Sequence, residues 1–378
     1  MAEILTNSEL PPFVSYNSLM NLSVGIVGLP NVGKSTLFNA LLKKQVASAA
    51  NYPFTTIEPN VGVVEVPDPR LSILADVVKN SEGLMPGFKI IPAIVKFVDI
   101  AGLVRGAHKG EGLGNQFLSH IREVDAIVFV LRDFKNPDII KTGQDPKDDL
   151  EVLKSELLLK DLETVDKRLD SLGREIKGAG QNDPKRLVLE ILEKAKKLVE
   201  TGRWLAEILD YDKLEKIKDL SLLSAKKFIV VLNCDEADLN KEIPHDGGIR
   251  ICAKLEEEFT DLSEDEQGAY LKELGIRESG LEKFIKKAYE VLGLATFLTA
   301  GAKEVRAWTI KVGTLAPEAA GVIHGDFERG FIAADVVDFE KFVEAGGWLK
   351  AKEKGLVKTI GKKDIIEDGQ VVEFKFTQ

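Results

Sequence analysis

Residues 28–35 form a complete phosphate-binding loop. They follow the pattern G-x-x-x-x-G-K-S, and they lie between an apolar run at 22–27 and a helix-like stretch at 36–42. Gly28 and Gly33 let the backbone curve so that successive N–H groups and the positive end of the helix face phosphates. We expect Lys34 to neutralise the β- and γ-phosphates and Ser35 to bind Mg²⁺. The motif predicts that a nucleoside triphosphate is the ligand.

Three residues further along the chain extend this predicted site. Asp99 ends an apolar run, where an aspartate can hold Mg²⁺ through a water, and the Gly102 N–H can reach the γ-phosphate. Thr56, in a segment that can close over the γ-phosphate, offers a hydroxyl to Mg²⁺ when triphosphate is bound. A simple Thr-rich turn is the structural alternative for Thr56.

The residue that usually positions the attacking water is replaced in this sequence. Leu103 stands where Ras-type proteins carry the glutamine that orients the attacking water, so hydrolysis must recruit another group or run slowly. The glycine-rich segment 106–115 follows, and it contains Lys109 and Glu111 as well as His108. His108 is a candidate for proton handling because its ordinary pKa is near neutrality, although a lone loop histidine is more often only solvated.

A second motif predicts which base is bound. Asn233, Cys234 and Glu236 follow an apolar run in the place of the guanine-specific pattern N-K-x-D, whose aspartate accepts two hydrogen bonds from guanine. A cysteine replaces the lysine, and the glutamate is one methylene longer than the aspartate. A site with altered polar pairing rejects the base whose groups it leaves unpaired, so adenine is favoured. The segment 252–254 corresponds to the remaining base-contacting loop.

The elements that must position these residues indicate an α/β fold. Alternating apolar and helical or loop segments predict a mostly parallel sheet with covering helices, whose functional loops lie at the carboxyl ends of the strands. The predicted strands are 22–27, 94–98, 126–131, 228–232 and 248–252.

An amphipathic segment at 146–222 interrupts this pattern. Leu158, Leu162, Val165, Leu169 and Leu172 recur at steps of four and three, and a second apolar run begins at 188. We interpret 146–222 as an inserted helical hairpin, in the form of an antiparallel coiled coil. Two ordinary helices that cover the sheet are the alternative, since the heptad pattern runs for only about two repeats.

The remaining sequence completes the predicted domains. The nucleotide-binding domain spans 21–145 and 223–293, and residues 1–20 form a polar extension. From 294 to 378 the chain becomes rich in strands and turns, which predicts a small α+β domain. Its predicted elements are a strand containing Val305 to Val312, a helix at 316–322, a strand at 331–337 and a turn into a strand at 368–376.

Composition excludes several protein classes. The 378 residues exceed one ordinary core, and a net charge of −10 argues against wholesale coating of nucleic acid. Two cysteines provide no disulfide framework and fit a reducing cytoplasm. No apolar stretch is long enough to span a bilayer. We therefore expect a cytoplasmic protein that does not bind membranes.

Taken together, the motifs resemble those of the YchF or Obg-like ATPase family. The resemblance rests on the phosphate loop, N-Y-P-F-T-T-I-E-P-N at 51–60, D-I-A-G-L-V-R-G-A-H-K-G-E-G-L-G-N at 99–115, N-x-x-E at 233–236 and K-E-V-R-A-W-T at 303–309. It covers essentially 21–378. It implies a P-loop NTPase that prefers ATP, a coiled-coil insertion, a C-terminal TGS domain with a β-grasp fold, and association with ribosomes.

The resemblance also assigns roles to residues. It implies phosphate contacts from Asn31, Val32, Gly33, Lys34, Ser35 and Thr36, magnesium at Ser35 and Thr56, and the base at Asn233, Cys234 and Glu236. Leu103 matches the hydrophobic replacement of the catalytic glutamine. Asn31 resembles an asparagine that binds an activating K⁺ in related NTPases. Lys141 departs from the family, where a histidine follows a D-I-I or N-I-I stretch, so no hydrolytic role is transferred there.

We thus expect a monomeric, slowly ATP-hydrolysing switch protein with Lys34, Thr56, Gly102 and His108 as catalytic candidates and the ribosome as partner. An Obg-type GTPase of ribosome assembly is one alternative. The other is a ribosome-binding module in which nucleotide is a structural ligand. In that case the partner surface would include a basic cluster near the hairpin tip, although interleaved acidic residues also fit a solvated helix face. The cluster comprises Lys167, Arg168, Arg174, Lys177, Lys185 and Arg186.

Overall fold

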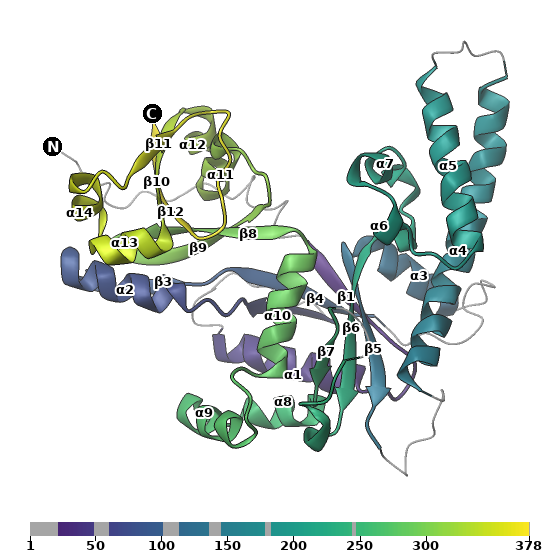
Figure 1. The fold of residues 1–378 in the computed structure, drawn as a ribbon, viewed down its shortest axis with the longest axis horizontal. Helices are drawn as coiled ribbons and strands as arrows, with labels where there is room; N and C mark the ends of the chain where they lie inside the picture. The colour runs from purple at the N-terminus through teal and green to yellow at the C-terminus, as the bar shows by residue number, and fades with distance from the viewer. Residues whose placement is uncertain are drawn as a thin grey trace. The chain divides into compact units, whose positions relative to one another are not determined.

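The chain divides into two compact units. The larger unit contains Leu22–Val66 and Val95–Leu292, and the smaller unit contains Pro67–Ile94 and Gly293–Gln378. Figure 1 shows the elements of both units in a computed structural model. The described residues are 22–48, 60–100, 113–135, 145–177, 183–243 and 247–377.

The larger unit is built on a six-stranded sheet. In order across the sheet, its strands are β2 (Val61–Glu65), β4 (Ile94–Asp99), β1 (Ser23–Val27), β5 (Ala126–Asp133), β6 (Lys227–Cys234) and β7 (Ile249–Ile251). β1 runs parallel to β4 and β5, β5 to β6, and β6 to β7. All five predicted strands are present, which confirms the predicted α/β fold with a mostly parallel sheet. Every residue of β1 is buried, as expected for a strand covered on both faces.

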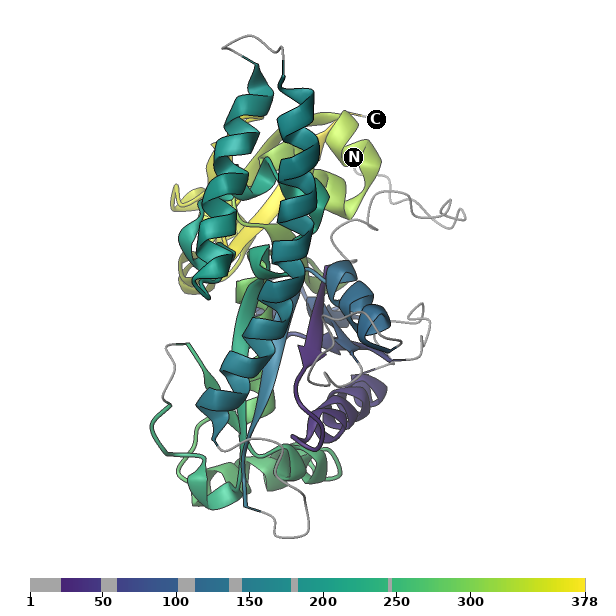
Figure 2. The same cartoon turned by 90° about the vertical axis from the view of Figure 1, so that its right-hand side faces the viewer.

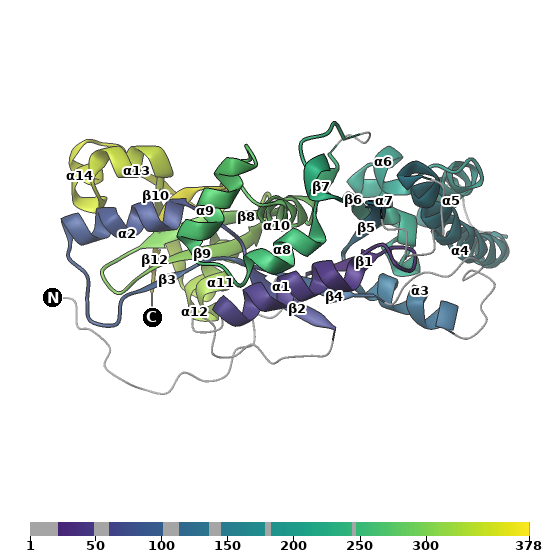
Figure 3. The ribbon, with the colours of Figure 1, turned by 90° about the horizontal axis from the view of Figure 1, so that it is seen from below.

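Helices cover this sheet and follow its strands. α10 contacts β6 and β7, and α1 lies beside α8 (Figure 3). The main helices of this layer are α1 (Lys34–Ser48), α3 (Leu113–Glu123), α8 (Ala253–Phe259), α9 (Glu264–Glu273) and α10 (Gly280–Val291).

Two long helices pack side by side in the segment predicted to be a hairpin (Figure 2). α4 (Pro146–Glu175) and α5 (Pro184–Glu200) each begin at an aspartate, whose carboxylate accepts a first-turn N–H, followed by proline at the first helical position. Among the apolar residues that predict the hairpin, Leu158, Val165 and Leu172 of α4 are buried. The buried residues of α5, which packs against α4, are Ile191, Leu192, Ala195 and Val199.

The hairpin ends earlier than predicted. α5 stops at Glu200, and Gly202 follows with φ of +72°, a left-handed conformation that ends the helix. The chain to residue 225 then forms short helices instead of continuing the hairpin to 222. These are α6 (Leu205–Ile208), α7 (Tyr211–Glu215), η3 (Lys218–Leu220) and η4 (Leu223–Ala225).

A buried carboxylate attaches α4 to the turn before β6. Asp161 is 1% exposed and accepts hydrogen bonds from the Leu223 and Ser224 N–H groups at 2.8 and 2.7 Å, and from the Ser224 hydroxyl. Trp204 fixes the same region, because its fully buried ring contacts Phe129 and its indole N–H donates to the Lys226 carbonyl. The inserted helices are therefore held to the sheet by directional contacts as well as by apolar packing.

The smaller unit has its own six-stranded sheet. In order across the sheet, its strands are β11 (Lys358–Ile360), β10 (Phe331–Asp338), β12 (Gln370–Phe376), β8 (Leu294–Ala300), β9 (Glu304–Lys311) and β3 (Lys89–Ile91). Its helices are α2 (Arg70–Ser81), α11 (Ala316–Ile323), α12 (Gly325–Arg329), α13 (Phe339–Ala345) and α14 (Trp348–Glu353).

The smaller unit contains a segment that lies outside the predicted C-terminal domain. The sequence predicts that residues 67–94 belong to the nucleotide-binding domain. In the structure they cluster with the C-terminal residues, because β3 pairs in parallel with β9 and α2 contacts β8 and β9. The predicted strands at 305–312, 331–337 and 368–376 are present as β9, β10 and β12. Val312 falls just beyond β9 and is 72% exposed.

No helix within the described ranges is both long enough and apolar enough to cross a membrane.

We predict that Asp161→Ala lowers the free energy of unfolding by about 2–5 kcal/mol, because the buried N–H groups of Leu223 and Ser224 lose their acceptor. Chemical denaturation measures the change. Asp166→Ala is the matched control, since that carboxylate on the same helix is 45% exposed and pairs with Lys196 in solvent. Equal effects of the two substitutions would contradict the anchoring role.

Candidate nucleotide-binding site

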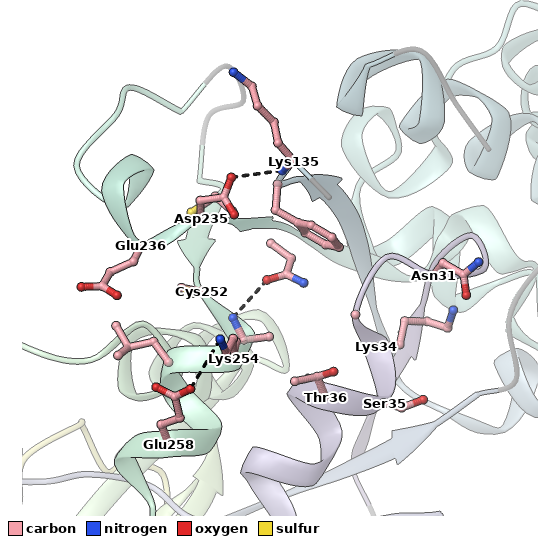
Figure 4. Close-up of a pocket in the computed structure, with 16 residues that line it drawn as sticks. Asn31, Lys34, Ser35, Thr36, Lys135, Asp235, Glu236, Cys252, Lys254 and Glu258 are labelled. Carbon is pink, nitrogen blue, oxygen red and sulfur yellow. Dashed lines mark hydrogen bonds and ion pairs between the residues drawn. The ribbon is translucent and has the colours of Figure 1, made fainter. Parts of the chain in front are cut away.

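The predicted site residues meet at the carboxyl ends of the parallel strands in the larger unit. The strand register places Asp99 beside Ile26 and Asp133 beside Cys234. A cavity of about 620 Å³ opens there (Figure 4), which is within the usual range for small-molecule sites. One side of the cavity is formed by the phosphate loop. The other side, which we call the base side, is formed by the segments that follow β5, β6 and β7.

At two glycines, the backbone of the phosphate loop passes very close to neighbouring atoms. Gly33 has φ of +92°, and a Cβ at this position would lie 2.1 Å from Asn233 Nδ2. A Cβ at Gly28 would lie 2.5 Å from the Val130 carbonyl oxygen. Asn31 also adopts a left-handed conformation, with φ of +62°. Both glycines are therefore required by space around the loop.

Lys34 occupies a partly dehydrated position. Its side chain is 9% exposed, and its ammonium donates to the Leu29 carbonyl at 2.8 Å. Burial lowers the pKa of Lys34, and the opposing influence is the charge of Asp99. Burial likewise raises the pKa of Asp99, while Lys34 acts to lower it. An ammonium in such surroundings interacts more strongly with phosphate than one in bulk water.

Asn233 joins the two sides of the cavity. Its side-chain N–H donates to the Val32 carbonyl at 2.9 Å, and its side-chain oxygen accepts from the Ala253 N–H at 3.0 Å. The residue is 7% exposed, so both bonds are shielded from water. One amide thus connects the phosphate loop with the start of α8.

Cys234 lines the base side of the cavity from a buried position. It is 2% exposed, and burial raises the pKa of its thiol to about 11. Arg250 on β7 bonds to this thiol and pairs with Asp133 at the end of β5. Cys234 consequently supports the floor of the cavity as a neutral thiol.

Glu236 and Phe134 give the base side its chemistry. Glu236 is exposed, lies across the cavity from Lys34, and accepts a hydrogen bond from the Tyr270 hydroxyl at 3.1 Å. Phe134 is half-buried, with the Arg132 guanidinium 4.6 Å from its ring centroid. An aromatic face and a carboxylate suit a planar base that carries an amino group.

Most of the predicted binding residues line this cavity. Those that do are Asn31, Gly33, Lys34, Ser35, Thr36, Asn233, Cys234 and Glu236. Gly28 and Val32 shape the loop without lining the cavity, and Val32 is buried with 1% exposure. Thr56, Gly102, Leu103 and His108 lie outside the described residues, so their predicted roles stay predictions.

Sequence reasoning missed several lining residues. Phe134 and Lys135 directly follow β5 and line the cavity. The signal that could have identified them is their position after the carboxyl end of β5, the strand that pairs with β6. Asp235, the unassigned position within the N-x-x-E segment, also lines the cavity, and its carboxylate accepts a hydrogen bond from the Lys135 N–H at 3.0 Å. Leu255 and Glu258 belong to α8, just beyond the predicted loop at 252–254.

Ser35 and Asp99 have the donor chemistry for magnesium. A hydroxyl and a carboxylate are hard oxygen donors, which Mg²⁺ prefers. Asp99 ends β4 beside β1, the strand that leads into the phosphate loop. Among the described residues there is no cluster of three or more His, Cys, Asp or Glu side chains that could hold a metal ion by itself.

Comparison with known proteins agrees with this site. Residues 23–168 match MMR_HSR1, described as a 50S ribosome-binding GTPase, and residues 294–377 match YchF-GTPase_C, described as a protein of unknown function. The Ribosome-binding ATPase YchF of Bacillus subtilis is 46% identical over 375 residues, covering 94% of this chain and 100% of the relative. The chain belongs to the YchF family. The Ribosome-binding ATPase YchF of Escherichia coli O157:H7 is 45% identical, covering 94% of this chain and 99% of its own.

A solved structure of the family has the same fold. The Schizosaccharomyces pombe YchF GTPase superposes with a TM-score of 0.81 at 37% identity, covering 94% of this chain and 98% of that one. The family resemblance inferred from the motifs is therefore confirmed. The names of the YchF relatives include both ATPase and GTPase, so the residues on the base side of the cavity must be considered to decide which base is preferred.

We predict that Asn233→Ala weakens nucleoside triphosphate binding by about ten- to a hundredfold, because the Val32 carbonyl and Ala253 N–H lose their buried partner. Isothermal titration calorimetry measures the affinity. Asn240→Ala is the control, since its exposed amide donates to the Leu274 carbonyl, away from the phosphate loop. Unchanged binding by Asn233→Ala would show that the loops keep their arrangement without this amide.

Proposed function

We propose that this protein is a cytoplasmic, monomeric, magnesium-dependent ATPase that binds ribosomes in a nucleotide-dependent way. The observation that carries the proposal is that the phosphate loop and the N-x-x-E segment line the same cavity. The names of its relatives, Ribosome-binding ATPase YchF, point in the same direction. In this proposal α4 and α5 form the coiled-coil insertion and residues 294–378 form the TGS domain.

The base side favours adenine over guanine. Guanine recognition by N-x-x-D uses a short carboxylate that accepts two hydrogen bonds at once, whereas Glu236 is longer and is already bonded to Tyr270. A site loses affinity for a ligand when it leaves that ligand's polar groups unpaired. Adenine presents an amino group that needs only one acceptor, and Phe134 offers a surface for stacking.

The phosphate side supports slow hydrolysis. Lys34 holds a positive charge near the phosphates, and Ser35 and Asp99 would hold Mg²⁺, which neutralises phosphate charge when bound. Thr56 and Gly102 remain the proposed switch residues, and His108 the proposed proton-handling group. Leu103 in place of glutamine accounts for low intrinsic turnover. Asn31 is the proposed K⁺ ligand, and comparison of turnover in potassium and in sodium tests that role.

We predict that the protein binds an Mg²⁺-ATP analogue more tightly than an Mg²⁺-GTP analogue, and that Glu236→Asp shifts this preference toward GTP by about tenfold. The shorter carboxylate restores the guanine acceptor. Calorimetric titration in potassium buffer measures both affinities. Position 234 is left unchanged, because Cys234 is buried against Arg250 and a lysine there would add a second cation.

Glu258→Asp is the matched control for this experiment, since Glu258 also lines the cavity but pairs with Lys254 on α8. It should leave the ratio of ATP to GTP affinity unchanged. Tighter GTP binding by the unaltered protein would instead identify an Obg-type GTPase.

We predict that ribosome co-sedimentation is greater with an ATP analogue than with ADP, and that Lys34→Ala removes this difference because it removes the buried phosphate-binding cation. Lys43→Ala on the exposed side of α1 is the control. Ribosome binding that is normal in Lys34→Ala and insensitive to nucleotide in the unaltered protein would support the binding-module alternative. The basic cluster is then the first surface to test, although Glu175 pairs with two of its members, Arg168 and Lys185.

A further inference from the structure

Tyr270 is the protein's own hydrogen-bond partner of the base-side carboxylate. Its hydroxyl donates to Glu236 Oε1 at 3.1 Å, across 34 positions of sequence. The neighbouring carboxylate raises the pKa of Tyr270, so the phenol stays protonated and remains a donor at neutral pH. Tyr270 itself does not line the cavity.

The Tyr270 ring is held in place by the helix that borders the cavity. It packs edge-on against Phe259 of α8, with ring centroids 5.5 Å apart, in a cluster with Leu255 and Cys252. α8 begins at Ala253, whose N–H is bound by Asn233. The donor of Tyr270 is thus connected through packed residues to the amide that joins the two sides of the cavity.

The start of α9, the helix that carries Tyr270, is also secured. Ser263 and Glu266 form a capping box at its first turn. Gln267 donates to the carbonyls of Phe259 and Leu262 at 2.7 and 3.0 Å, which ties α9 to the end of α8. A side chain on a helix anchored in this way presents its donor in a defined position.

The Tyr270 bond constrains what Glu236 can accept. A guanine base contacts a carboxylate through N1–H and its amino group together, which requires both carboxylate oxygens to face the base edge. With Oε1 bonded to α9, the carboxylate points away from the phosphate loop (Figure 4), and only part of its accepting capacity is directed to a base. Adenine has a single amino group at this edge and needs only one acceptor.

We propose that Tyr270 is a specificity-determining positioning residue, which acts through Glu236 to disfavour guanine in the nucleotide site. This inference rests on the proposed function, because it requires Glu236 to contact the base. Tyr270 acts on the choice of base and leaves the phosphate side unaffected.

The test compares Tyr270→Phe with the unaltered protein. Tyr270→Phe keeps the ring against Phe259 and removes only the donor. The ratio of ATP-analogue to GTP-analogue affinity should therefore fall by about three- to tenfold, which corresponds to the net strength of a typical solvent-exposed hydrogen bond. Affinity for inorganic tripolyphosphate, which has no base, should not change. Competition binding with all three ligands in the presence of Mg²⁺ measures these effects. Tyr211→Phe, at a site 76% exposed on α7, is the matched control and should change none of them.

A double-mutant cycle separates positioning from a structural role. In a Glu236→Ala background, Tyr270→Phe should have no further effect on the affinity ratio, because the two residues act as one unit. Equal loss of affinity for all three ligands would assign Tyr270 a structural role and overturn the inference. If Glu236→Ala shifts the ratio and Tyr270→Phe does not, the inference fails while the base site stands. If Glu236→Ala leaves the ratio unchanged, the proposed base contact itself is wrong.

Discussion

The two hydrogen bonds of the Asn233 amide hold the nucleotide site together. A phosphate loop needs a compact, inward-facing backbone, and here that backbone passes so close to Asn233 that only glycine fits at position 33. The same amide binds the first N–H of α8. Because the amide is shielded from water, loss of either bond would leave a buried polar group unpaired. The phosphate side and the base side are therefore parts of one hydrogen-bonded unit.

A second polar anchor connects this unit to the inserted helices. Asp161 of α4 receives the N–H groups at the start of the 3₁₀ turn that leads into β6, and β6 ends at Asn233 and Cys234. Trp204 and Phe129 pack in the same region, so α4 and β6 are joined by both polar and apolar contacts. The inserted helices are thus attached at the start of β6, and the base side of the cavity is attached at its end.

In the proposed base site, the number of partners that the Glu236 carboxylate has would decide which base it accepts. In Glu236 the extra methylene allows the carboxylate to reach Tyr270, and a carboxylate shared with the protein is a weaker acceptor for a base that needs two bonds. The buried thiol of Cys234 replaces a lysine without adding charge beside Arg250. The cysteine in place of lysine and the glutamate in place of aspartate are therefore both accommodated by neighbouring residues, Arg250 for Cys234 and Tyr270 for Glu236.

Local sequence was sufficient to predict the phosphate loop, the five parallel strands of the larger sheet and the two long helices, because each depends on short-range patterns of glycine, apolar residues and caps. It also determined the family, eight of the individually named residues that line the cavity, and the loop at 252–254 that lines it as well. The tertiary structure alone decided that residues 67–94 join the C-terminal unit, since the pairing of β3 with β9 links segments more than 200 positions apart. It likewise revealed Phe134 as a wall of the cavity and Tyr270 as the partner of Glu236. Such contacts depend on which strand edges and helix faces meet in space, and no periodicity within either segment encodes that meeting.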